Sequence, residues 1–349
     1  MASCSIVLAT WPAWKNALIC HVGLGLLVSA PVGVLLYLLP KSARKPVGIV
    51  SALVTSVAAP LAVKYEYYID KDTTSWMIPF LLSSFGFVSF FKSIGAAYGL
   101  YPEGADRDLQ TWLLWYVSFP EPVFKEGKPV PLVPYLDGVL EQGCVLLWKI
   151  IELATVLSIL MNYGEDNPLP DLLSSMISLY WIYSFASGCL EIGATIVVLQ
   201  GYKSAPVFDN PLVKSRSYRE CWGSRWNKPV QTLLKRTVYI PARKVGQSAT
   251  VASLLVFVAS GILHEYNFFV HNYRSYAPGH AILFFMYLVV LMLVEERYLH
   301  RFKDGIPTII ISLLLQLPVL PLFSWLFVSS WLESGMLKGV SEMVPYMKC

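Results

Sequence analysis

The chain contains about eight long apolar runs, and these runs restrict its possible folds more than any other feature. A helix that crosses a bilayer needs about 20 mainly apolar residues. Lipid offers no partner to backbone polar groups, so spanning segments close their hydrogen bonds within α-helices. The predicted spans are residues 17–39, 47–63, 77–101, 143–163, 171–200, 249–272, 279–299 and 306–332. The sequence therefore predicts an all-α, polytopic membrane protein in which residues 1–349 form one membrane-embedded domain.

Composition supports this class and excludes others. Hydrophobic residues make up 55% of the chain and charged residues only 14%, whereas about a quarter of the residues in a soluble domain are charged. A chain this apolar is neither disordered nor an ordinary soluble enzyme. The formal net charge of +4 is small, so a nucleic-acid partner is not expected.

Basic residues are clumped, and their distribution predicts the orientation in the membrane. With eight spans, residues 40–46, 102–142, 201–248 and 300–305 face one side, and together with Arg297 they hold 19 of the 27 Lys and Arg residues. Cytoplasmic loops of membrane proteins are enriched in Lys and Arg. We therefore expect that side to be cytosolic and both termini to be lumenal. A separate local signal concerns the last span, where Pro318 and Pro321 predict a bend because proline removes a helical hydrogen bond.

The six cysteines show no spacing that indicates a bonded framework. They stand at positions 4, 20, 144, 189, 221 and 349, and no two form a CxxC pair. Most lie in or beside apolar runs, where free thiols behave as small apolar side chains. We expect neither a disulfide framework nor a zinc site. The first apolar run is predicted to be a retained helix rather than a removed signal.

Polar residues line one face of the predicted span 249–272. Ser260, His264, Asn267 and His271 follow one another at spacings of four, three and four, which places them on the same side of a helix. Such a stripe should face a protein interior or a wet cavity. A neutral imidazole at that depth can accept a proton and return it. His264-Glu265 does not continue as HExxH, so no metal site is predicted.

A basic and aromatic segment precedes this span. Residues 215–229 combine several Arg and Lys residues with Trp222 and Trp226. One interpretation is a loop that anchors at lipid headgroups, and the other is a platform for a polyphosphate ligand. The aromatic stretch 108–116 in the first long loop predicts a helix lying in the membrane interface. The HxxxDG match at His300–Gly305 lies in a short loop and is interpreted as chance.

Together, these two segments resemble the membrane-bound O-acyltransferases, and most closely their wax synthase-like branch. That branch has a phrase of the form FWGRRWN before a membrane helix with SGxxHE. Here the phrases are CWGSRWN at residues 221–227 and SGILHE at residues 260–265. Phe91-Lys92 in an earlier span is similar as well. Cys221 and Ser224 depart from the usual Phe and Arg.

The resemblance implies a tunnel through the membrane, an acyl-CoA co-substrate and a hydroxyl acceptor, with no other cofactor. It implies His264 as the catalytic residue, Asn227 as its partner, and an endoplasmic reticulum location. The candidate contacts to acyl-CoA or the acceptor are Arg219, Trp222, Arg225, Trp226, Lys228, Lys235, Arg236, Ser260, Glu265, Asn267, His271 and Lys92. The lysine and arginine side chains among these candidates can form charge-assisted hydrogen bonds with the CoA phosphates.

The function predicted from these residues is transfer of a fatty acyl group from acyl-CoA to a long-chain alcohol, as in a wax ester synthase. Diacylglycerol, a sterol or a small alcohol are alternative acceptors, because the shape of the tunnel decides between them. Two alternatives lie outside the enzyme class. A proton-coupled transporter would move substrate without CoA release, and a lipid-binding scaffold would tolerate loss of His264. The oligomeric state is left open.

Overall fold

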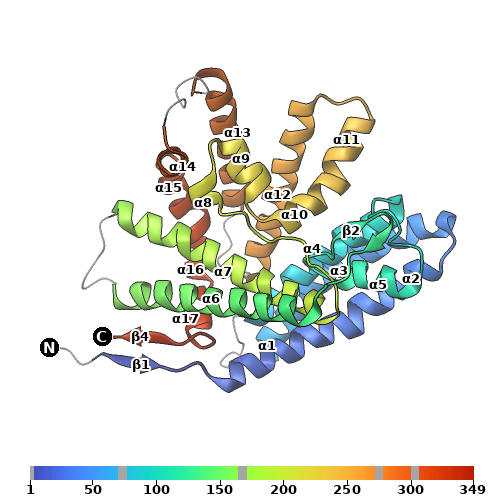
Figure 1. Ribbon diagram of the computed structural model, residues 1–349, viewed down its shortest axis with the longest axis horizontal. Coiled ribbons are helices and arrows are strands. Elements are labelled where there is room, and N and C mark those ends of the chain that lie inside the picture. Colours follow the sequence, from blue (N-terminus) through green and yellow to red (C-terminus); the bar gives the residue numbers. More distant parts are fainter. Residues whose placement is uncertain (1–3, 70–76, 164–170, 272–277, 300–305) are drawn as a thin grey trace.

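The computed structural model describes residues 4–69, 77–163, 171–271, 278–299 and 306–349 (Figure 1). Helices dominate this part of the chain. The longer helices are α1 (Trp11–Leu24), α2 (Ala30–Leu38), α3 (Lys41–Ile69), α4 (Met77–Tyr98), α5 (Leu109–Val117), α6 (Tyr135–Asn162), α7 (Asp171–Leu199), α12 (Ala249–His271), α13 (His280–Val294) and α14 (Thr308–Gln316).

Short elements connect and extend these helices. The short α-helices are α8 (Pro211–Lys214), α9 (Tyr218–Glu220), α10 (Lys228–Leu234), α11 (Ile240–Lys244), α15 (Leu320–Phe323), α16 (Ser329–Glu333) and α17 (Met336–Ser341). Turns of π-helix are η1 (Gly25–Ser29), η2 (Cys221–Arg225), η3 (Lys235–Tyr239), η4 (Glu295–Leu299) and η6 (Ser324–Val328). Two antiparallel pairs join β1 (Ser5–Val7) to β4 (Tyr346–Lys348) and β2 (Phe124–Lys125) to β3 (Lys128–Pro129).

Four of the predicted spans are confirmed as helices that are long and apolar enough to cross a membrane, and the last predicted span makes a fifth if its bent helix pair is counted as one span. The four continuous helices are Pro79–Tyr98, Tyr135–Asn162, Asp171–Leu199 and Ala249–Val270. The fifth consists of Thr308–Gln316 and Leu320–Glu333, which meet at an angle of 51°. This break contains Pro318, so the predicted bend is confirmed, since proline removes a helical hydrogen bond. The chain is thus a multi-pass membrane protein.

The helices that contain the other three predicted spans have different bounds from those predicted. Residues 17–39 are divided among α1, η1 and α2, and residues 47–63 lie inside the longer α3. The run 279–299 forms α13 and continues as η4. The expected count of about eight spans and the central tunnel stay predictions.

Strand β2 of the first long loop and the chain termini lie at opposite ends of α6 (Figure 1). Before α6, the amide of Leu132 donates to the carbonyl of Gly201 at 2.8 Å, which joins the two long loops. After its last turn, the Asn162 side chain donates to the carbonyl of Met347 at 2.7 Å. The start of the second long loop and the C-terminal strand therefore lie at opposite ends of this helix, and the side of the membrane on which each lies stays a prediction.

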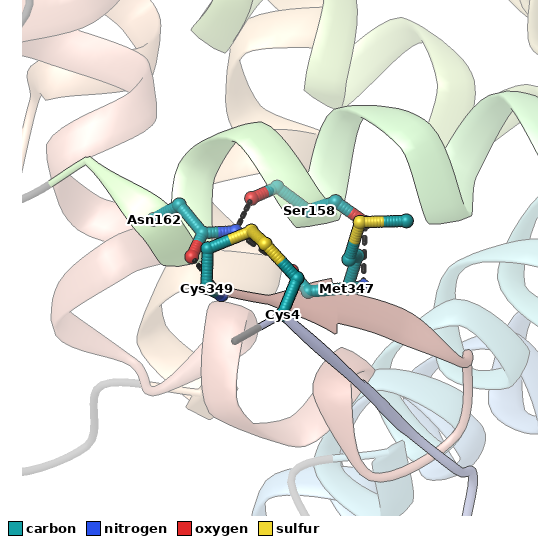
Figure 2. The surroundings of a disulfide bond; sticks show 5 residues. All are labelled: Cys4, Ser158, Asn162, Met347 and Cys349. Carbon is teal, nitrogen blue, oxygen red and sulfur yellow. Dashed lines mark hydrogen bonds between the residues drawn. A yellow bond between two sulfur atoms is a disulfide. The ribbon is translucent and has the colours of Figure 1, made fainter. Parts of the chain in front are cut away.

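A disulfide closes the end that carries the termini, and here the sequence-based prediction was wrong. Cys4 and Cys349 are bonded (Figure 2), and β1 pairs with β4 from Ser5–Lys348 to Val7–Tyr346. The backbone amide of Cys349 also donates to Asn162 Oδ1 at 2.7 Å. Sequence spacing carries no signal for this bond, because the two cysteines are 345 positions apart and only the strand pairing brings them together.

The helix expected in the membrane interface forms as α5, but its rings are buried. Asp108 caps α5 by accepting from the amide of Thr111 at 2.7 Å. Trp112 and Trp115 are almost fully buried, and Trp112 Nε1 donates to the carbonyl of Gly33 in α2 at 2.7 Å. The aromatic stretch therefore joins α2 and α4 rather than lying against lipid. The prediction was wrong on this point, because helical spacing does not reveal which neighbour covers an apolar face.

Candidate active site

His264 lies in the middle of α12, and one hydrogen bond fixes its tautomer. Its Nδ1 lies 2.8 Å from the backbone carbonyl of Ser260, one turn earlier. A carbonyl oxygen can only accept, so Nδ1 must carry the proton in this contact. In the neutral ring, Nε2 then presents a lone pair, and it has no hydrogen-bond partner among the described residues. The side chain is half-buried. This arrangement leaves one nitrogen free to act as a base.

Aromatic rings flank this imidazole. The ring of Phe285 in α13 lies 4.8 Å from it, and the ring of Phe327 in η6 lies 5.1 Å from it, between centroids. The bent last span and α13 therefore both contribute to the surroundings of His264. These apolar rings exclude water from part of the site, and electrostatic interactions are stronger in such surroundings than in water.

The neighbours of His264 in the SGILHE phrase hold α12 against α13. A Cβ atom on Gly261 would lie 3.0 Å from Cα of Ile282, so a side chain here would force the helices apart. Glu265 is buried and accepts from the backbone amide of Ile282 at 3.1 Å, in the first turn of α13. Gly279, the N-cap of that helix, makes no side-chain cap bond. Glu265 therefore supplies the missing cap from a different helix.

Two further polar residues of the predicted stripe follow His264. Asn267 is buried, and its Oδ1 has no hydrogen-bond partner in the described part of the chain. The hydroxyl of its neighbour Tyr266 is also unpartnered there. A buried polar atom without a partner costs about 1–3 kcal/mol, so a ligand donor near Asn267 Oδ1 would be stabilised. The side chain of His271 lies outside the described residues.

Asn227 is the N-cap of α10, and other residues of α10 contact α12. Its backbone is left-handed, with φ 42°, and its Oδ1 accepts from the amide of Val230 at 3.3 Å. Val230 and Leu234 of α10 pack against Leu263, the residue before His264. No hydrogen bond joins Asn227 to His264 within the described residues. The structure thus brings the two segments together through an apolar contact.

A chain of aromatic contacts makes a second connection between the two motifs. Trp226 and Trp222 have ring centroids 4.6 Å apart, and Trp222 lies 5.9 Å from Phe284. Phe284 contacts Phe285 at 5.6 Å, and Phe285 contacts His264. The Nε1 of Trp222 is buried without a described hydrogen-bond partner. The tryptophans therefore form part of a continuous aromatic region that ends at the imidazole.

Some lysine and arginine side chains between positions 215 and 236 are paired with carboxylates, and others have no ion pair among the described residues. Arg225 is held by the carboxylates of Asp209 and Glu220, each at 2.6 Å. Burial alone would raise the pKa of Glu220, but its hydrogen bonds and the nearby arginine charges hold that pKa below its ordinary value. A phosphate would have to compete with both carboxylates for Arg225.

The other cations of this segment differ in their partners. Arg219 pairs with Glu296 at 3.0 Å on the surface. Lys228 and Lys235, in contrast, form no ion pair with any residue that the structure describes. Lys235 is exposed and Lys228 is half-buried. Among the predicted phosphate contacts of this segment, these two lysines are therefore the cations left free for a ligand.

The remaining two candidates, Lys92 and Arg236, meet at a carboxylate that sequence reasoning missed. Lys92 Nζ lies 2.5 Å from Glu121 Oε1, and Arg236 Nη1 lies 2.9 Å from Glu121 Oε2. Trp115 Nε1 also donates to Glu121 at 3.1 Å. Burial would raise the pKa of Glu121, but the two cations and their hydrogen bonds lower it overall. A lone Glu between two prolines gives no sequence signal for this contact.

The comparisons with known proteins agree with the motifs. Residues 204–287 match the Membrane bound O-acyl transferase family, and this match includes both motif segments. The probable long-chain-alcohol O-fatty-acyltransferase 7 of Arabidopsis thaliana is 28% identical over 189 residues, or 51% of each chain. The long-chain-alcohol O-fatty-acyltransferase of Simmondsia chinensis is 29% identical over 35% of this chain and 36% of its own.

A third relative has a different acceptor in its name. The acyl-CoA–sterol O-acyltransferase 1 of Arabidopsis thaliana is 29% identical over 34% of this chain and 36% of its own. The chain spans about half the length of the curated relatives it matches. These findings confirm the predicted resemblance to the membrane-bound O-acyltransferase family and, within it, to the wax synthase-like branch.

Proposed function

We propose that the chain is an acyl-CoA-dependent O-acyltransferase in which His264 is the general base. The observation that carries this proposal is the hydrogen bond from His264 Nδ1 to the carbonyl of Ser260, which directs the lone pair of the neutral ring to Nε2. The names of the relatives support the reaction class.

The reaction needs a base because a thioester is already activated, whereas an alcohol is a weak nucleophile. Nε2 of His264 takes the proton of the acceptor hydroxyl while its oxygen attacks the thioester carbonyl. The carbon–sulfur bond then breaks, and the imidazolium returns a proton to the CoA thiolate. The ester and free CoA are the products, and no acyl-enzyme is formed.

Two asparagines complete the proposed site. Asn227 already uses Oδ1 to cap α10, so its side-chain NH₂ group is the part that donates to the developing oxyanion. Removal of one such donor typically lowers the rate by about 10²–10³. The unpartnered Oδ1 of Asn267 accepts from a donor group of the bound substrates other than the reacting hydroxyl, whose single proton goes to His264. Both roles follow from which atoms the fold leaves free.

Lys228 and Lys235 bind the CoA phosphates in this proposal, because the described structure leaves both without an ion pair. Arg225, Arg219 and Arg236 instead hold the segment in place through their carboxylate partners. The acyl chain lies among apolar helices, where each buried methylene contributes about 0.8 kcal/mol.

The preferred acceptor is a long-chain fatty alcohol, which makes the product a wax ester. Several relatives are named for that acceptor. A sterol is the second candidate, because another relative is named as a sterol acyltransferase.

We also propose that both termini are lumenal and that the chain resides in the endoplasmic reticulum. The Cys4–Cys349 disulfide supports this location, since disulfides persist in oxidising compartments. The segments around Leu132 and Gly201, which belong to the two long basic loops, lie at the other end of α6, as expected for the cytosolic side.

Acceptor-dependent release of CoA thiol tests the proposed function. Membranes that contain the chain are given palmitoyl-CoA with hexadecanol, a sterol or diacylglycerol, and empty membranes are the control. Release with one acceptor, matched by formation of its ester, supports the proposal and identifies the acceptor. A chain that is inserted and folded but releases no CoA with any of them would contradict it.

A further inference from the structure

A charged pair lies inside the membrane-spanning helix α6, and the proposed reaction gives it no role. Lys149 and Glu152 stand near the middle of this helix, and Lys149 Nζ donates to Glu152 Oε2 at 2.8 Å. Their side chains are only 13% and 5% exposed. Charged residues at such a depth are costly, and membrane proteins retain them chiefly where they serve a function. The pair is therefore a candidate for a role beyond the packing of α6.

Both members of the pair contact α7. Ser184 Oγ donates to Glu152 Oε1 at 3.0 Å, and the serine is fully buried. The ammonium of Lys149 lies over the ring of Tyr183, 4.9 Å from its centroid. Such a cation–π contact is stronger where water is excluded, and only 7% of Tyr183 is exposed. The pair thus holds Tyr183 in place at the contact between α6 and α7.

The ring of Tyr183 contacts the motif segment, which is the phrase CWGSRWN at residues 221–227. Between ring centroids, Tyr183 lies 5.9 Å from Trp226 and 5.2 Å from Phe208. Phe208 in turn lies 5.5 Å from Trp226. Aromatic rings at these separations attract one another, so the three rings form one cluster. Through Tyr183, the charged pair is therefore connected to the motif segment.

This aromatic cluster borders Asn227. Two backbone hydrogen bonds, with N–O distances of 3.1 and 2.9 Å, join residues 207–209 to residues 225–228. Phe208 lies between these bonds on one side, and Trp226 and Asn227 lie between them on the other. Because Asn227 directly follows Trp226, a shift of Trp226 would also move the amide group that is proposed to donate to the oxyanion.

We propose that Lys149 and Glu152 are positioning residues, which hold Tyr183 against Trp226 and so keep Asn227 aligned for acyl transfer. This inference rests on the proposed function, from which Asn227 takes its role. Neither charged side chain touches the substrate. Loss of the pair should act on kcat rather than on KM, because an oxyanion donor stabilises the transition state more than the bound substrate. A misplacement of about 1 Å is enough to lower a rate by about 10²-fold.

Acyl transfer per folded molecule, measured over a range of acyl-CoA concentrations, tests this inference. In Lys149→Met, kcat should fall by about tenfold or more, with a smaller change in KM. Lys149→Arg keeps a cation that can pair with Glu152 and lie over Tyr183, so it should recover most of kcat. Gln142→Leu is the matched control, because Gln142 Nε2 donates to Glu191 Oε2 at 2.9 Å between the same two helices. Gln142 lies about two turns of α6 from Lys149, so its variant should keep a near wild-type kcat.

A double-mutant cycle separates positioning from general destabilisation. In the Asn227→Ala background, Lys149→Met should lower kcat further by less than about twofold, since the group that it positions is already gone. A further loss as large as in the wild-type background would overturn the inference. An undiminished kcat in Lys149→Met, or an equal loss in Gln142→Leu, would overturn it as well. If Lys149→Met does not fold, the variant that combines it with Glu152→Leu gives the result, because it leaves no unpaired charge in the membrane.

Thiol labelling gives a second measurement that does not depend on the reaction. Cys221 begins the motif segment and is fully buried, and its carbonyl accepts from the amide of Trp226 at 2.9 Å. Cys144 is exposed and serves as the internal reference. In mild detergent, N-ethylmaleimide should modify Cys221 at least about fivefold faster in Lys149→Met than in the wild type, because the segment opens more often. Mass spectrometry of the labelled peptides measures both rates.

The two measurements distinguish the inference from the proposed function. A folded wild type that transfers no acyl group to any acceptor would contradict the proposed function, and the labelling of Cys221 would still test the positioning of the segment. Faster labelling of Cys221 in Lys149→Met but not in Gln142→Leu would support the positioning role. Equal labelling of Cys221 in the wild type and Lys149→Met would overturn it.

Discussion

Glu121 neutralises two buried cations, so its removal should destabilise the protein strongly. In the Glu121→Gln variant, Lys92 and Arg236 lose the only carboxylate that pairs with them in the described structure. The side chains are 10% exposed for Glu121, 0% for Lys92 and 20% for Arg236, so solvent screens them little. Loss of one partner from a buried ion pair costs about 3–5 kcal/mol. We expect a loss of that size in the free energy of unfolding.

The three charges also predict an asymmetry between two substitutions. Lys92→Met leaves Glu121 paired with Arg236, and it removes a fully buried cation from the cluster. Replacement of a buried charge by an apolar side chain of similar size is often close to neutral when the remaining charges stay balanced. Lys92→Met should therefore destabilise the protein less than Glu121→Gln. The control is Glu126→Gln, because Glu126 is exposed and its pair with Lys125 is long, at 3.9 Å.

Lowering the pH should remove the contribution of Glu121 to the stability of the wild-type protein. The pKa of Glu121 is lower in the folded chain than its ordinary value of 4.5. A group with a lowered folded pKa contributes stability above its unfolded pKa, and this contribution is lost as the pH falls through the folded value. The wild type should thus lose stability below about pH 4.5, whereas Glu121→Gln lacks this loss.

Thermal unfolding in mild detergent measures both effects, and Trp115 beside Glu121 makes tryptophan fluorescence a suitable signal. The melting temperature of Glu121→Gln should be lower than that of the wild type by on the order of 5–10 °C. A change under about 1 kcal/mol, or a greater loss in Lys92→Met than in Glu121→Gln, would refute this account of the cluster.

Three other predictions concern the proposed site and the termini. Asn227→Ala should lower kcat by about 10²-fold with a smaller effect on KM for acyl-CoA; an unchanged kcat would remove its role. Lys228→Ala should raise KM for acyl-CoA several-fold, whereas Arg225→Ala should chiefly lower the yield of folded protein, and the opposite pattern would exchange their roles. Cys4→Ser should free the thiol of Cys349, and a membrane-impermeant maleimide should then label this thiol only when the lumenal side is exposed. Labelling of Cys349 in intact microsomes would contradict the proposed orientation.

The sequence predicted those parts of the structure that depend on local pattern. The span 249–272 and its polar face follow from apolar run length and helical spacing, so His264 could be found without coordinates. The bend in the last span follows from Pro318, whose effect is local. Both motif segments could be recognised for the same reason, since each is continuous in the sequence.

Features that depend on distant contacts could not be predicted. Glu121 meets Arg236 across 115 positions, and Cys4 meets Cys349 across 345. The aromatic face of α5 was expected in the interface, because its pattern does not show that α2 covers it. For the same reason, the sequence could not show that Arg225 is occupied by two carboxylates.

The most direct test of the account compares His264→Ala with His280→Ala. His280 begins α13 and has no role in the proposed chemistry. Both variants are expressed to matched levels in membranes, and acceptor-dependent CoA release and ester formation are measured together. The account predicts a loss of about 10²–10⁴-fold for His264→Ala and near wild-type release for His280→Ala. Undiminished ester formation by folded, inserted His264→Ala would contradict the claim that His264 is the base.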